Sequence, residues 1–178
     1  NAKRLAMYAR CVQEAGMVPI LEPEVLYDGM HSRMRSRAVI TESLHALVQA
    51  LGEHGVDPSA VIIKTSMAMS GKGTGKIDTP EEVAEDTLAA LTEAVPAAVP
   101  GIVFLSGGQG NDQATDNLRA IAKAAKAAGA PWGISFSYAR ALQDEALKIW
   151  GGKDENVQAA REAFLGRLLK VSKATLGE

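Results

Sequence analysis

The chain has 178 residues, of which 47% are hydrophobic and 22% are charged, and its formal net charge is −2. This length fits one globular domain, residues 1–178, while the near-neutral charge gives no electrostatic basis for binding nucleic acid or an anionic membrane. No apolar stretch approaches the roughly 20 residues of a membrane-spanning helix. The single cysteine, Cys11, excludes a disulfide framework and a CxxC-type zinc site. We therefore expect a reducing compartment, the cytoplasm.

Four short apolar runs alternate with helical stretches along the chain. The runs are continuous, which predicts strands covered on both faces, and they occupy 17–21, 61–63, 102–105 and 133–136. Helices are expected over 36–52, 78–95, 111–128, 141–150 and 155–173. This alternation predicts parallel βαβ units. Because an eight-stranded barrel needs about 200 residues or more, the chain is either a small open sheet or half of something larger.

Polar residues follow the first two strands. Lys64 ends the apolar run 61–63, where burial disfavours the charged form of an amine and leaves a nucleophile at neutral pH. Alternatively, the Lys64 side chain could extend from the strand end and keep its charged amine in water. Glu22 and Glu24 flank a proline in an extended segment and so point the same way. They would either shuttle protons for Lys64 or only neutralise it.

The third and fourth strands end in candidate anion-binding residues. Ser106-Gly107-Gly108 lies between a strand and a helix, where glycine amides and a hydroxyl can hold a phosphate. Arg140 lies just past the fourth strand and could grip the same anion, or it could simply begin a surface helix. The carboxyl ends of parallel strands share one face, so these residues should converge.

Three other features carry no predicted chemistry. The glycine-rich run 70–76 resembles a P-loop, but Ser70 replaces the first glycine and no Ser or Thr follows its lysine, so we predict a flexible loop. The basic residues Arg33, Arg35 and Arg37 predict a solvated helix start. The three histidines lack ligand-like spacing, and no metal site is expected.

The strand ends resemble those of class I fructose-bisphosphate aldolases. The matching segments are Val18–Glu24, Ile63-Lys64, Phe104–Gln109 and Phe136–Gln143, with further matches at Val95–Gly101 and Ala146–Lys153. Glu22, Lys64 and Ser106 follow one another at equal intervals of 42 residues, the separations of that family. The resemblance covers nearly the whole chain.

This resemblance implies the second half of a TIM (β/α)8 barrel, strands five to eight with their outer helices, as a fragment of a larger one-domain enzyme. It implies a lyase of glycolysis and gluconeogenesis that reversibly cleaves fructose 1,6-bisphosphate to dihydroxyacetone phosphate and glyceraldehyde 3-phosphate. Lys64 would form the Schiff base, Glu22 would shuttle protons as water is lost, and Glu24 would support the lysine. Neither a metal nor another cofactor would take part, because the covalent imine through Lys64 is the electron sink.

The resemblance also implies a binding site for the C1 phosphate, formed by Ser106, Gly107, Gly108, Ser137, Ala139 and Arg140. Ala139 would contribute its backbone amide, although it replaces a glycine of the family, so this turn must accommodate a Cβ. The family's first four strands and C-terminal tail supply further catalytic residues that this sequence lacks. The isolated chain is therefore expected to be inactive, and the full-length protein is expected to be a homo-oligomer.

Two alternatives stay open. The first is another Schiff-base aldolase of the same fold with a different phosphorylated sugar as substrate. The second is a non-catalytic, phosphate-binding half-barrel, two copies of which could close one barrel as a symmetric dimer.

Overall fold

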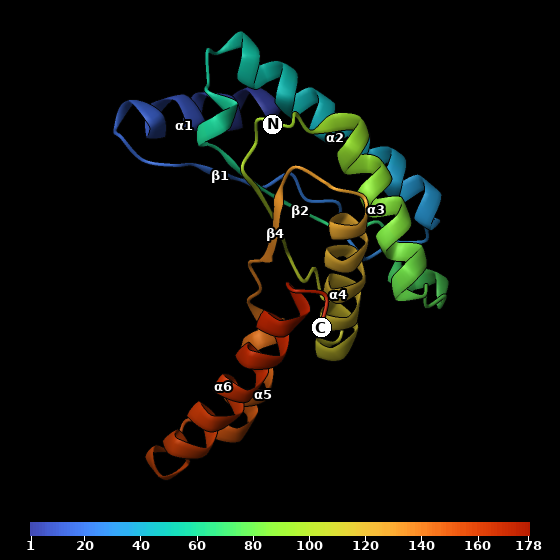
Figure 1. The fold of residues 1–178 in the computed structure, drawn as a ribbon. Helices are drawn as coiled ribbons and strands as arrows, with labels where there is room; N and C mark the ends of the chain where they lie inside the picture. The colour runs from blue at the N-terminus through green and yellow to red at the C-terminus, as the bar shows by residue number, and fades with distance from the viewer.

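A sheet of four parallel strands lies at the centre of the computed structural model, which describes residues 1–178 (Figure 1). The strands are β1 (Ile20–Leu21), β2 (Ile62–Thr65), β3 (Gly101–Phe104) and β4 (Gly133–Phe136), and each pairs with the next along the chain. The predicted parallel α/β architecture is confirmed. Since each crossover returns the chain to a parallel neighbour, all four strands end at the same edge of the sheet.

Six α-helices surround or extend from the sheet. They are α1 (Ala2–Glu14), α2 (Arg33–Glu53), α3 (Pro80–Ala94), α4 (Asn111–Ala127), α5 (Arg140–Trp150) and α6 (Val157–Ala174), with short 3-10 turns at Pro58–Ala60, Lys72–Thr74 and Asp154–Asn156. The predicted start of α3 is confirmed, because Thr79 and Glu82 form a reciprocal capping box there. Helix α1 was not predicted. None of these helices has the length and apolar character required to cross a bilayer.

Only one face of the sheet is covered. Side chains of β2 and β3 alternate between buried and half-buried, and the buried set joins the core beneath α2, α3 and α4 (Figure 1). On the opposite face Ile20 is 48% exposed. The expectation that both faces are covered is thus wrong for residues 1–178, because the helices α2, α3 and α4 all pack on the same side.

Helices α2 and α3 are joined by an ion-pair cluster. Arg33 contacts Asp86 at 2.5 Å and Glu82 at 2.7 Å, and its side chain is only 19% exposed. Arg37 also reaches Asp86, and Asp78 completes the cluster. The prediction of a solvated helix start is therefore wrong for Arg33, because the acidic side chains of α3 replace water around its guanidinium.

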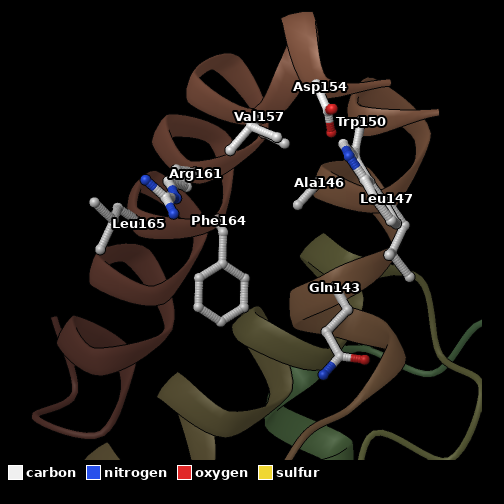
Figure 2. Close-up of a pocket in the computed structure, with 10 residues that line it drawn as sticks. Gln143, Ala146, Leu147, Trp150, Asp154, Val157, Arg161, Phe164 and Leu165 are labelled. Carbon is white, nitrogen blue, oxygen red and sulfur yellow. The ribbon is translucent and has the colours of Figure 1, made fainter. Parts of the chain in front are cut away.

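Helices α5 and α6 form a hairpin that projects away from the sheet (Figure 1). Between them lies an apolar hollow of about 740 Å³, whose side chains are drawn in Figure 2. Phe164 on α6 and Leu147 and Trp150 on α5 are among its lining residues. No lining residue of this hollow belongs to the strand ends that carry the predicted chemistry.

Candidate active site

Lys64 and Glu22 lie side by side at the ends of neighbouring strands. Leu21 pairs with Ile63 in the sheet, so the residues that follow them are brought level. The Nζ atom of Lys64 lies 3.1 Å from Oε1 of Glu22, and the two side chains are 20% and 42% exposed. A carboxylate therefore lies beside a largely buried amine, a position that either expected role of Glu22, proton transfer or neutralisation, requires.

Glu24 does not take part in this ion pair. The backbone of the next residue, Val25, is fixed by the Ser66 hydroxyl, which accepts from its N–H at 2.9 Å and donates to its carbonyl at 3.1 Å. The side chain of Glu24 is exposed and forms no ion pair or hydrogen bond. Its supporting role toward Lys64 thus remains a prediction.

The loops that follow β1 and β2 are joined by their backbones. The N–H groups of Gly71, Lys72 and Gly73 donate to carbonyls of the first loop, His31, Tyr27 and Gly29, each at 2.8 Å. A Cβ on Gly71 would collide with the carbonyl of Gly29. The run 70–76 is a loop, as predicted, but its centre is held against its neighbour by three hydrogen bonds.

The loop after β3 offers unused hydrogen-bond donors. Ser106 is 5% exposed, and its hydroxyl forms no hydrogen bond within the protein. Gly107 and Gly108 adopt positive φ angles of 57° and 86°, and neither backbone N–H donates to another group of the protein. Positive φ at two successive positions suits glycine. A hydroxyl and two free amides on one tight turn can bind an anion.

Arg140, the first residue of α5, reaches this loop from the end of β4. A Cβ built on Gly108 would lie 3.4 Å from Nη1 of Arg140, which places the guanidinium beside the glycine. Arg140 forms no ion pair or hydrogen bond. The structure thus brings together the predicted anion-binding residues of the third and fourth strands and leaves the positive charge unneutralised.

The turn between β4 and α5 holds the remaining predicted residues. The N–H of Ser137 donates to the Phe104 carbonyl at 2.8 Å, which fixes the end of β4 against the end of β3. Ala139 has φ of −103°, a value open to any L-residue, so its Cβ introduces no backbone strain. Its N–H forms no hydrogen bond within the protein and is free for a ligand.

Two buried amide side chains, which the sequence did not predict, support the loop after β3 that contains Ser106, Gly107 and Gly108 (the glycine loop). Asn117 of α4 donates to the Gln109 side-chain oxygen at 2.8 Å, and both residues are buried. Their remaining amide hydrogens contact the sulfur atoms of Met67 and Met69. No sequence pattern marked this pair, because Gln109 lies in the loop and Asn117 in α4, and both residue types usually face water.

Comparison with known proteins places the chain in a family. The family model for class I fructose-bisphosphate aldolases, described as glycolytic, matches residues 1–178. The chain is 49% identical to fructose-bisphosphate aldolase 6, cytosolic, of Arabidopsis thaliana, covering 99% of this chain and 49% of that protein. It is 47% identical to fructose-bisphosphate aldolase B of Ovis aries, covering 100% of this chain and 48% of that protein. The chain therefore belongs to the class I fructose-bisphosphate aldolase family.

A solved structure agrees with this assignment. The fructose-bisphosphate aldolase of Plasmodium falciparum superposes with a TM-score of 0.93 at 42% identity, over 99% of this chain and 50% of that one. The four strands and their helices thus match part of the aldolase barrel. The chain spans about half the length of the curated relatives it matches.

Proposed function

We propose that this chain carries the imine-forming lysine and the C1-phosphate site of an enzyme that reversibly cleaves fructose 1,6-bisphosphate. The products would be dihydroxyacetone phosphate and glyceraldehyde 3-phosphate. The observation that carries the proposal is the 3.1 Å contact between Lys64 and Glu22 at the ends of two adjacent strands. Membership of the aldolase family supplies the substrate class.

The covalent chemistry begins at Lys64. Its neutral amine adds to the C2 carbonyl carbon of the open-chain sugar and gives a carbinolamine. Glu22, at 3.1 Å from the amine, transfers the proton that lets the C2 oxygen leave as water. The protonated imine then accepts the electron pair of the breaking C3–C4 bond and becomes an enamine. The group that removes the C4 hydroxyl proton is expected from the part of the family's barrel that this chain does not match.

The phosphate of C1 would occupy the space between the glycine loop and Arg140. The Ser106 hydroxyl and the amides of Gly107, Gly108 and Ala139 would donate to its oxygens, because none of these donors is used within the protein. The Arg140 guanidinium supplies the positive charge. Ser137, fixed between β3 and this turn, would complete the site.

We further propose that residues 1–178 are one unit, strands five to eight of a TIM barrel, in a longer one-domain enzyme. The parallel order of four consecutive strands, the helices on one side and the match to half of each relative support this placement. The name of the Arabidopsis relative supports a cytosolic location. The longer protein would be a homo-oligomer, which sedimentation of the purified enzyme tests.

Imine formation tests the proposed function. The longer protein is treated with dihydroxyacetone phosphate and borohydride, and we expect a mass increase on the peptide that contains Lys64. Lys64→Met should abolish labelling, and the exposed Lys126→Met of α4 should leave it unchanged. Absence of an adduct would contradict the proposal. Phosphate binding without an adduct would favour the non-catalytic half-barrel, and a preference for another sugar phosphate would favour the other aldolase.

A further inference from the structure

A buried arginine of α6 links the starting turns of two other helices. Arg167 is 6% exposed, and Nε donates to the Ala141 carbonyl of α5 at 3.1 Å. Its two Nη atoms donate to Asp112 and Thr115 of α4, each at 2.9 Å. The guanidinium thus links α5 to α4 through three acceptors on these two helices.

Tyr138 forms a second link between the same two segments. It lies between Ser137 and Ala139, is 8% exposed, and donates its hydroxyl to the Ala114 carbonyl of α4 at 2.8 Å. Burial raises the pKa of Tyr138, so the phenol remains a donor at any ordinary pH. The turn after β4 is thereby held to α4 at two places.

Both linked segments carry parts of the proposed phosphate site. Arg140 immediately precedes Ala141, whose carbonyl Arg167 holds. The glycine loop ends where α4 begins, one residue before Asp112 in that helix. The separation between the Arg140 guanidinium and the amides of Gly107 and Gly108 therefore depends on how α4 and α5 are held together.

We propose that Arg167 and Tyr138 are positioning residues for the C1-phosphate site: without touching the ligand, they hold the Arg140 turn at the distance from the glycine loop at which both grip one phosphate. This inference rests on the proposed function. A buried guanidinium is stable only when its N–H groups have hydrogen-bond partners. Removing that of Arg167 leaves the Ala141 carbonyl and the Thr115 hydroxyl without this donor. The predicted consequence is a loss specific to phosphate rather than to the imine.

Two ligands separate these effects. Dihydroxyacetone phosphate and dihydroxyacetone form the same imine with Lys64, but only the first carries a phosphate. Borohydride trapping on the longer protein gives the half-saturating concentration of each. We expect Arg167→Met to raise this concentration about tenfold for dihydroxyacetone phosphate, the effect of one strong hydrogen bond, and to leave that for dihydroxyacetone unchanged.

Matched variants control for a general loss of structure. Tyr138→Phe keeps the buried ring and removes only its hydroxyl, so it tests the inference even if Arg167→Met does not fold; we expect a smaller loss that is also phosphate-specific. Arg167→Lys keeps the charge and should restore part of the affinity. Arg161→Met, an exposed arginine of α6 with no ion pair, should behave like the unmodified protein.

The outcomes are distinct. The positioning role would be overturned if Arg167→Met and Tyr138→Phe lost affinity equally for both ligands, or lost none for either. In both cases labelling of the unmodified protein would still support the proposed function. No labelling of the unmodified protein with either ligand would remove the proposed function, and the positioning role with it.

Discussion

The guanidinium of Arg140 lies against the backbone of Gly108, so close that a Cβ at position 108 would come 3.4 Å from Nη1. This contact joins the end of β4 to the loop after β3, two segments more than 30 residues apart in sequence. Because Gly108 has φ of 86°, an L-residue there would be strained, although its Cβ would meet the guanidinium at an ordinary van der Waals distance.

Gly108→Ala should weaken binding of the phosphorylated substrate. Alanine would hold an L-residue at positive φ, and relief of this strain would shift the loop amides, so we expect the free energy of unfolding to fall by about 1 kcal/mol and the affinity for dihydroxyacetone phosphate about tenfold. Calorimetric titration measures the affinity. Gly110→Ala in the same loop is the control, since φ there is −60° and nothing lies within 4 Å of the new Cβ. Equal effects at the two positions would contradict a specific requirement for positive φ at Gly108.

Glu22→Gln should slow imine formation. The amide retains the shape of the side chain near Lys64 but cannot exchange a proton at neutral pH, and we expect the rate of Lys64 labelling to fall about 100-fold. Glu24→Gln should have a smaller effect, because the exposed side chain of Glu24 forms no hydrogen bond or ion pair. Rapid-quench trapping with borohydride provides the rates. If Glu24→Gln proved the slower enzyme, the proton-transfer role would belong to Glu24.

Arg33→Ala should destabilise the fold. Its guanidinium bridges α2 to two carboxylates of α3 and is only 19% exposed, so we expect a loss of about 2 kcal/mol in the free energy of unfolding. Arg35→Ala is the matched control, because its 3.7 Å pair with Glu42 is more than 60% exposed on both sides and should contribute less than about 1 kcal/mol. Urea denaturation measures the free energy of unfolding of both variants. Similar losses would show that burial does not distinguish the two pairs.

The protein should lose part of its stability in acid through Asp112. Its carboxylate accepts hydrogen bonds from Lys170, which has the larger effect, and from Arg167. These bonds lower the pKa of Asp112 from the ordinary 3.8 to about 2. A carboxylate with a depressed folded-state pKa stabilises fully above its unfolded value, and this contribution disappears as the pH falls through the folded value. Asp112→Asn should thus be less stable than the unmodified protein above pH 3.8, with the difference vanishing toward pH 2. A difference independent of pH in urea midpoints would contradict this.

The sequence predicted the strands well where local pattern decides the structure. The run at 133–136 forms a strand over the predicted residues, and the start of α3 follows from a capping box whose residues are close in sequence. The run at 17–21 was too long, because β1 pairs with a single neighbour and only two of its residues, Ile20 and Leu21, are bonded in register. Helix α1 was not predicted, and its buried residues are the small Ala6 and Ala9, while its larger apolar residues Met7 and Tyr8 are more than half exposed.

The convergence of polar residues at the strand ends was expected from the sequence, whereas the buried side chains that hold these segments together were not. Lys64, Glu22 and Ser106 stand at strand ends, where the topology itself implies convergence. The contacts of Arg167 reach 26 to 55 residues back along the chain, and nothing local distinguishes it from a surface arginine. The same holds for Arg33, whose acidic partners lie 45 to 53 residues away. Such pairings depend on how helices pack, which no local pattern encodes.

The backbone hydrogen bonds between the loops after β1 and β2 decide which positions at this edge of the sheet can change by mutation. Its three hydrogen bonds involve only backbone atoms, so they hold the two loops together whatever side chain occupies an exposed position such as Lys72. Gly71 and Gly73, by contrast, face the Gly29 carbonyl with no room for a Cβ. Mutation can therefore change the exposed side chains of these two loops one at a time, while Gly71 and Gly73 preserve the course of the chain.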